Sequence, residues 1–143
     1  MLNPVKVSDG IWRGPRPTSL ADWEVLKKLG IKFSLDLQTG CNFLQDGSPL
    51  SETLTAEIFD IKSYSHPLGE ILPPTTVELK EALHFIFAHQ PVYVHCHAGV
   101  DRTGMVIAYY RIKKQNWGKN MAISEMKRLG MHPWYSFWWP FKL

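Results

Sequence analysis

The sequence predicts an α/β domain with a central, mostly parallel sheet flanked by helices. Short apolar runs typical of buried strands alternate with longer segments of helical periodicity, and capping residues, glycines or prolines separate them. Strands that alternate with helices imply parallel strands joined by right-handed crossovers. We expect one domain, residues 1–143, because the chain has 143 residues, 45% of them hydrophobic, and shows no repeat or interdomain linker.

Local signals mark where the elements begin and end. Asp9-Gly10 is a turn dipeptide that often joins two strands, and Ser19 with Asp22 resembles a capping box that opens a helix. The expected elements are, in order, a hairpin within 5–13, a helix over 20–29, a strand over 31–37, a loop over 38–52 beside the site, a strand over 57–64, a rigid connection over 66–74, a helix that Thr75 or Thr76 caps and Pro91 stops, a strand over 92–95, a helix over 103–114 and a helix that Asn120 caps and that runs to Leu129.

The passage from His95 to Gly104 is the only glycine-punctuated turn that leads from a strand straight into a helix. Ligands of such sheets bind at the carboxyl ends of strands. The passage places the thiol of Cys96 at the strand end and the guanidinium of Arg102 at the helix start. Gly99 lets the backbone curl, so successive N–H groups can point inward, and the helix dipole adds positive charge. The sequence therefore predicts a phosphate-binding loop here.

Cys96 and Arg102 have complementary roles in this prediction. The field of the loop favours the thiolate over the thiol, so Cys96 can attack at neutral pH. Arg102 can pair bidentately with two phosphoryl oxygens and face the charge that develops in the transition state. A buried, inert thiol is the alternative, but it leaves the arginine and glycine spacing unexplained. The residues expected around the phosphate are His97, Ala98, Gly99, Val100, Asp101 and Arg102.

Cys96, five further residues and then Arg102-Thr103, preceded by His95, resemble the signature loop of the protein tyrosine phosphatase superfamily. The order of elements and the segment 10–17 resemble its compact, atypical dual-specificity branch. The resemblance implies a dual-specificity-phosphatase-like fold and a phosphocysteine intermediate on Cys96, with phosphate bound by Arg102 and the loop amides. It further implies that the Thr103 hydroxyl helps the thiolate leave. It implies no metal and no cofactor, and we expect His95 to order the loop by hydrogen bonding.

The general acid of this family is usually an aspartate on a separate loop, and this sequence has none at the corresponding place. Residues 66–74 resemble the acid loop of the phosphatases of regenerating liver. In this resemblance, Glu70 of the present sequence corresponds to the position of their general acid. Glu70 is therefore our leading candidate. Asp101, Asp60 and the absence of any acid remain the alternatives.

The loop residues also bear on the substrate. Ala98-Gly99, with Asp101 before the arginine, resembles inositol phosphatases and phytase-like members of the superfamily, so an inositol polyphosphate or a phosphoinositide is the expected substrate. His97, Arg13, Arg16, Lys62 and Lys80 would supply the positive charge if they ring the pocket, and otherwise are solvated. Phosphotyrosine in proteins is the main alternative. An RNA 5′-triphosphatase and a catalytically dead phospho-binding module are more distant ones.

Charge and composition limit the partners. A formal charge of +3 favours an anionic phosphorylated small molecule or a phosphoprotein but lacks the basic stripe of a nucleic-acid binder. Two cysteines cannot build a disulfide framework, and no run approaches a membrane span. We expect a soluble, cytoplasmic monomer, although a signal peptide removed beforehand would leave no trace.

Two further features have open alternatives. Cys41 follows a predicted strand, and in some lipid-directed relatives a cysteine near that point forms a reversible disulfide with the nucleophile; otherwise Cys41 has no redox role. The aromatic tail, residues 131–141, is expected to cover the core, and a membrane or partner surface is the alternative.

Overall fold

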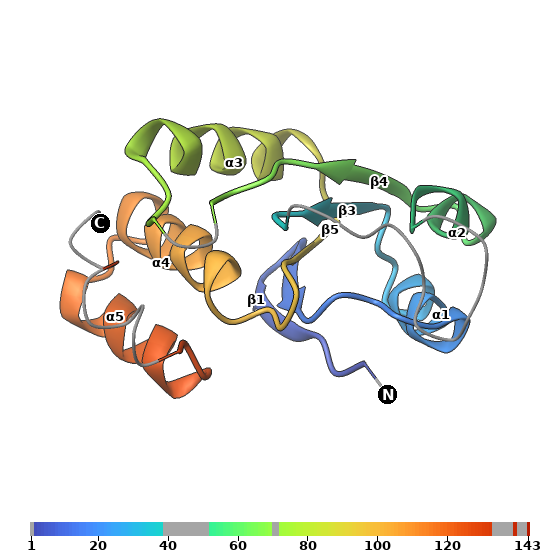
Figure 1. Ribbon diagram of the computed structural model, residues 1–143, viewed down its shortest axis with the longest axis horizontal. Coiled ribbons are helices and arrows are strands. Elements are labelled where there is room, and N and C mark those ends of the chain that lie inside the picture. The colour runs from blue at the N-terminus through green and yellow to red at the C-terminus, as the bar shows by residue number, and fades with distance from the viewer. Residues whose placement is uncertain (1, 39–51, 70–71, 133–138, 140–142) are drawn as a thin grey trace.

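Five strands form a single sheet in the structure, a computed structural model that describes residues 2–38, 52–69, 72–132, 139 and 143 (Figure 1). The strands follow the order β1-β2-β5-β3-β4, in which β1 and β2 are antiparallel and the other neighbours are parallel. The elements are β1 Val5–Ser8, β2 Ile11–Gly14, α1 Leu20–Lys28, β3 Phe33–Asp36, α2 Glu52–Ile58, β4 Lys62–Ser65, α3 Thr76–Ala88, β5 Val92–His95, α4 Arg102–Lys114 and α5 Lys119–Arg128. The predicted α/β class with a mostly parallel sheet is confirmed.

Helices cover both faces of the sheet (Figure 1). One apolar core joins the sheet to α3, α4 and α5, and it holds Val92 and Val94 of β5. A second core joins the other face to α1 and α2, and it holds Tyr93. Because side chains alternate along a strand, the central strand β5 contributes to both cores. This alternation decides on which side of the sheet each residue of the site lies.

Most of the predicted elements are confirmed, with their caps. The hairpin turns at Asp9-Gly10, where Gly10 has a φ of 81°. Ser19 caps α1 by accepting the Asp22 N–H, but the Asp22 carboxylate accepts from Leu2 N–H and Thr18 N–H instead of completing a capping box. The full capping box occurs at α3, in which Thr75 and Glu78 bond reciprocally.

The strand predicted over 57–64 is wrong in its first half. Residues 52–58 form the helix α2, and only Lys62–Ser65 pair with the sheet, as β4. Thr55 and Ala56 are buried while Leu54 and Ile58 are exposed, so the buried face has helical spacing that the short segment did not reveal. Glu52 consequently belongs to a helix and not to the predicted loop, and its side chain is buried.

The last helix begins earlier than predicted. Gly118 is the N-cap of α5, and the helix starts at Lys119. Asn120, the predicted cap, therefore lies in the first turn of the helix.

Candidate active site

Cys96 directly follows β5, which is the middle strand of the sheet. Its side chain is 2% exposed and belongs to the core beneath α4, on the same face as Val92 and Val94. His95 points to the opposite face, where its ring stacks with that of Tyr93 at 5.7 Å between centroids. Strand alternation thus separates two adjacent residues: the thiol faces α4, and the imidazole faces a buried group of charged side chains on the other side.

The segment between Cys96 and α4 is a tight turn that requires glycine. Gly99 has a φ of 75°, in the left-handed region, and a Cβ there would overlap the carbonyl group of Gly14 and Pro15 N. The turn is therefore packed directly against the backbone that follows β2. The N–H of Arg16 donates to the carbonyl of His97 at 3.0 Å and joins the two segments.

A second arginine supports the turn from below. Arg13, on β2, is 3% exposed, and its Nη2 donates to the carbonyl oxygen of Gly99 at 2.9 Å. After the turn, Gly104 N–H donates to Val100 and Met105 N–H to Asp101, which are the first bonds of α4. The N-terminus of α4 therefore begins at the end of the turn, as an anion-binding loop requires.

The predicted loop residues differ in exposure. His97 and Ala98 are exposed, Val100, Asp101 and Arg102 are half-buried, and Gly99 and Thr103 are buried. Thr103 Oγ1 is fully buried and has no hydrogen-bond partner among the described residues. The Thr103 hydroxyl is thus available to an anion at the loop, and the side chains of His97 and Ala98 face solvent.

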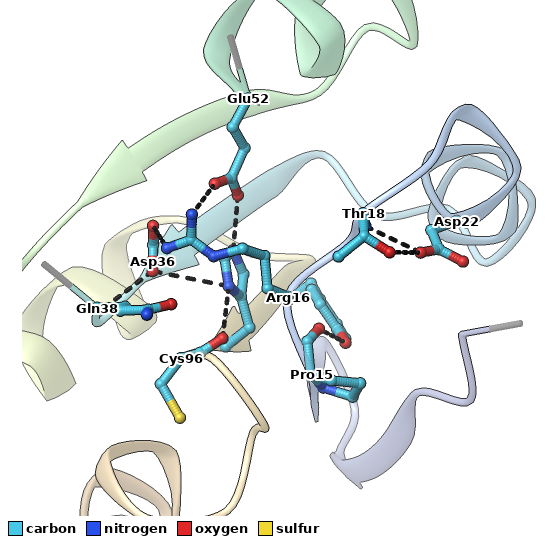
Figure 2. Close-up of polar contacts among 10 residues, drawn as sticks. Pro15, Arg16, Thr18, Asp22, Asp36, Gln38, Glu52 and Cys96 are labelled. Atoms are coloured by element: carbon cyan, nitrogen blue, oxygen red, sulfur yellow. Dashed lines mark hydrogen bonds and ion pairs between the residues drawn. The ribbon is translucent and has the colours of Figure 1, made fainter. Parts of the chain in front are cut away.

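On the other face of the sheet, the side chains of Arg16, Asp36, Glu52 and His95, each at most 9% exposed, form a network of polar contacts (Figure 2). Arg16 Nη2 lies 2.6 Å from Asp36 Oδ2, and Arg16 Nη1 lies 3.5 Å from Glu52 Oε2. His95 Nε2 lies 2.9 Å from Glu52 Oε1, and His95 Nδ1 lies 3.7 Å from Asp36 Oδ1 and 3.3 Å from the carbonyl oxygen of Cys96.

This network fixes the backbone before and at Cys96. Figure 2 shows the Cys96 sulfur pointing away from Arg16, Asp36 and Glu52 while its carbonyl oxygen faces them. The expected role of His95 as a residue that orders the loop is consistent with these contacts. Burial raises the pKa of Asp36 above its usual value, while His95, Gln38 N–H and Arg16 oppose the shift.

Sequence analysis missed three members of this network. In the sequence, Arg16 suggests only a pocket cation, Asp36 belongs to a predicted strand and Glu52 to the end of a predicted loop. The carboxyl end of a buried strand, where Asp36 lies, was the one available signal. Asp36, Glu52 and His95 offer ligand atoms within 4.8 Å of one another, but the Arg16 guanidinium already pairs with both carboxylates.

The four cations that were expected around the pocket do not ring it. Arg13 is buried beneath the turn, and the Arg16 guanidinium pairs with Asp36 and Glu52 on the other face of the sheet. Lys62 begins β4, at the opposite edge of the sheet from the carboxyl ends of the strands. Lys80 lines a groove of about 390 Å³ with Lys113 and Lys114, which end α4. Eleven residues of helix separate Lys113 from Arg102, about 16 Å along the axis.

The candidate general acids are only partly described. Glu70 lies outside the described residues, although Leu68 and Gly69 before it leave from the carboxyl end of β4, on the same sheet edge as Cys96. Asp101 Oδ1 accepts the N–H of His132 at 2.7 Å. Asp60, with a φ of 64°, lies before β4 and so at the opposite edge of the sheet.

Two other predictions fall mostly outside the described residues. Cys41 is one of the undescribed residues, and Cys96 is a free thiol. Of the aromatic tail, Met131 and Trp139 are described; both are buried in the core with α3, α4 and α5. Among the described residues, no helix combines the length and the apolar character needed to cross a membrane.

A buried thiol at a strand end, a turn packed on glycine and a helix N-terminus that begins with arginine define the class of cysteine-based phosphatases. Comparison with known families agrees: residues 12–139 match the family described as dual specificity phosphatase, catalytic domain. The match covers most of the sequence, so the chain belongs to this family.

Solved structures with this fold include two from different organisms. The core catalytic domain of the PP-IP phosphatase SIW14 from S. cerevisiae is 24% identical with a TM-score of 0.77, and the match covers 94% of this chain and 81% of that one. TpbA from P. aeruginosa is 21% identical with a TM-score of 0.81, covering 99% and 85%.

Relatives found by sequence match shorter stretches. The dual specificity protein phosphatase TpbA of Pseudomonas aeruginosa is 50% identical over 40 residues, which are 28% of this chain and 18% of that protein. The phosphatidylglycerophosphatase and protein-tyrosine phosphatase 1 of Mus musculus is 33% identical over 63 residues, or 41% and 33%. The chain therefore aligns with one third or less of the length of these relatives.

Proposed function

We propose that the chain is a cysteine-dependent phosphomonoesterase in which Cys96 is the nucleophile, and that residues 1–143 form one phosphatase domain. The observation that carries the proposal is the position of Cys96 at the end of β5, directly before the Gly99 turn and the N-terminus of α4. Backbone N–H groups of such a turn and the helix dipole bind an anion where the thiol can reach its phosphorus.

The proposed reaction has two steps on the thiol. The Cys96 thiolate attacks phosphorus, a phosphocysteine forms, and the leaving oxygen departs with a proton from a general acid. Water then attacks the phosphocysteine and releases phosphate and the thiolate. Arg102 pairs with two phosphoryl oxygens throughout, and the buried Thr103 hydroxyl donates to the departing sulfur. No step requires a metal or a cofactor.

Glu70 is the proposed general acid. The Asp101 carboxylate already accepts a hydrogen bond from His132 N–H, so one of its oxygens is engaged. Asp60 lies before β4, at the sheet edge opposite to Cys96, so its carboxyl group does not reach the thiol. These two placements favour Glu70 among the three candidate carboxyl groups, because its described neighbours Leu68 and Gly69 extend from the sheet edge that carries Cys96; a reaction without a general acid stays the alternative.

For the substrate, we propose an inositol phosphate or a phosphoinositide with few phosphates. The exposed His97 and Ala98 leave room above the loop for a sugar-like ring and its hydroxyls. A highly phosphorylated inositol needs a ring of cations, and Arg13, Arg16, Lys62 and Lys80 do not form one. Of the undescribed segments, 39–51, 70–71 and 133–138 contain no lysine or arginine, and 140–142 contains one lysine, Lys142.

Phosphotyrosine in proteins is the second candidate, and the same lack of surrounding cations favours it. The two similar folds carry different names, a PP-IP phosphatase and a phosphatase whose structure was solved in complex with pTyr, so the fold leaves the choice open. The choice between the two substrates therefore depends on the residues that contact the substrate beyond its phosphate.

The test is phosphate release from inositol hexakisphosphate, a phosphoinositide and a phosphotyrosine peptide at equal concentration, with wild type, Cys96→Ser and Arg102→Lys. We expect wild type to turn over the phosphoinositide fastest and Cys96→Ser to be inactive on every substrate. Arg102→Lys keeps the charge but loses the bidentate fork, so it is expected to lose most of the activity. Fastest turnover of the peptide would replace the proposed substrate, and activity in Cys96→Ser would overturn the mechanism.

A further inference from the structure

Arg13 is a buried cation that lies between the Gly99 turn and the first turn of α4. Its side chain is 3% exposed, and Nη2 lies 2.9 Å from the carbonyl oxygen of Gly99. A Cβ placed on Gly104, in the first turn of α4, would lie 3.9 Å from the same nitrogen. The guanidinium therefore lies between the turn and the start of the helix, on the side away from solvent.

The carboxylate that interacts most strongly with the charge of Arg13 is that of Glu125, and this carboxylate also pairs with two other arginines. Both oxygens of Glu125 accept from Arg111, at 3.1 Å each, and Oε2 lies 3.9 Å from Arg128. Three guanidinium groups thus share one carboxylate. Burial lowers the pKa of Arg13, whereas the negative charges of Glu125 and Cys96 oppose the shift. Arginine stays protonated in proteins, so a net positive charge remains under the loop.

One of the donor groups of Arg13 makes no hydrogen bond within the described part of the chain. Nη1 is fully buried and has no hydrogen-bond partner among the described residues. A buried cation without full compensation is costly unless an anion balances it. The loop is the adjacent place where an anion forms, first as the Cys96 thiolate and then as bound phosphate.

We propose that Arg13 is a positioning residue of the phosphate loop and the buried counter-charge for the anion that the loop holds. Its bond to the Gly99 carbonyl turns that carbonyl beneath the loop, so that the N–H groups of the turn face the phosphate. Its charge favours the Cys96 thiolate from the side opposite to solvent. The inference rests on the function proposed above and adds a second cation, on β2, to Arg102.

Other charged and titratable groups interact with Cys96 and Arg13, and the variants have to leave these groups unchanged. The charge of Cys96 interacts with Arg13 on β2 and with Tyr93 on β5, and Asp101 and Arg102 lie at the end of the same loop. Arg13 in turn interacts with Glu125, Arg111 and Arg128 from α4 and α5. Tyr93 stays neutral at working pH, because burial raises the pKa of its hydroxyl, and that hydroxyl donates to Pro15 at 2.6 Å.

The experiment is alkylation of Cys96 by iodoacetamide, a neutral reagent, in the full chain from pH 5 to pH 9, with the modified residue located by mass spectrometry. Arg13→Gln keeps a donor for Gly99 and removes the charge, whereas Arg13→Lys keeps the charge. Lys6→Gln is the matched control, because it removes one charge from the exposed face of the neighbouring strand β1. Circular dichroism checks that each variant is folded.

We expect Arg13→Gln to be alkylated about tenfold more slowly than wild type at pH 6 and equally fast at pH 9. The reason is that a nearby cation commonly lowers the pKa of a thiol by about one unit. Arg13→Lys should follow wild type across the whole range, and Lys6→Gln should do the same. A merely structural role would lower the rate at every pH. A wild-type pH profile in folded Arg13→Gln would overturn the inference.

Protection by inorganic phosphate supplies the second readout. Lysine cannot reproduce the guanidinium fork at Gly99, so Arg13→Lys should need several-fold more phosphate than wild type to protect Cys96. Equal protection would refute the positioning role, and this comparison decides even if Arg13→Gln fails to fold. If phosphate fails to protect wild-type Cys96, the proposed function fails instead, so the two failures are distinguishable.

Discussion

The carboxylate of Glu52 lies 2.9 Å from Nε2 of His95, on the face of the sheet opposite to the thiol of Cys96. This contact ties the first residue of α2 to the residue immediately before the nucleophile. Both side chains are buried, and Arg16 lies against the same carboxylate at 3.5 Å. The position of Cys96 therefore depends on a network of polar contacts whose side chains are at most 9% exposed.

Replacing Glu52 by glutamine should destabilise the fold and disturb the site together. The substitution leaves Arg16 and His95 with one carboxylate fewer in a buried setting, which typically costs about 3 kcal/mol. We expect the free energy of unfolding in urea to fall by about that amount and kcat/KM to fall about tenfold. Glu57→Gln, on the exposed side of the same helix, is the control and should change neither. Unchanged stability in Glu52→Gln would show that the network does not hold the strand end.

Gly99→Ala should abolish most of the activity without unfolding the domain. The added Cβ meets the Gly14 carbonyl at a φ of 75°, so the turn must move away from β2. A displacement of about 1 Å at a reacting centre can cost roughly 100-fold in rate. Gly118→Ala is the matched control, because no atom lies within 4 Å of its Cβ position. If both variants turn over substrate at the wild-type rate, the turn is not the phosphate site.

Glu70→Gln tests the proposed general acid. Loss of a general acid typically costs roughly 10²–10⁴-fold on a substrate with a poor leaving group, and the defect should shrink with p-nitrophenyl phosphate, which needs less protonation. Asp101→Asn serves as the comparison, since its carboxylate is engaged by His132 N–H. A larger defect in Asp101→Asn than in Glu70→Gln, on the same poor leaving group, would move the acid into the loop.

Trp139→Ala should destabilise the domain. Trp139 is 0% exposed and belongs to the core beneath α3, α4 and α5, and removing a buried aromatic ring typically costs about 3–5 kcal/mol. Met121→Ala, at a position that is 59% exposed, should have little effect. Thermal unfolding of the two variants checks the expectation that the tail covers the core, and equal melting temperatures would speak for a surface role.

The elements that sequence analysis located correctly have strong local signals. Asp9-Gly10 supplies the positive φ of the hairpin turn, Thr75 with Glu78 supplies a complete capping box, and Val92–His95 is a short apolar run after a proline. The loop from Cys96 to Arg102 was identifiable because its residues are contiguous in the chain. Each of these features is encoded within about ten residues.

The features that were missed depend on contacts between distant residues. Arg16, Asp36, Glu52 and His95 come from four separate segments of the chain, and no local sequence pattern predicts that they meet. The helix α2 has seven residues, too few for helical periodicity to stand out from strand alternation. Arg13 likewise reads as a surface cation in the sequence and becomes a buried one only because β2 pairs with β5.

The most direct test of the central claim is to trap the phosphocysteine. Wild-type protein is mixed with a rapidly turned-over substrate, quenched within milliseconds and digested, and the peptide that contains Cys96 is weighed by mass spectrometry. The proposed mechanism predicts one added phosphoryl group on Cys96 in wild type and none in Cys96→Ser. Steady turnover with no phosphoryl group on Cys96, or turnover that survives in Cys96→Ser, would contradict it.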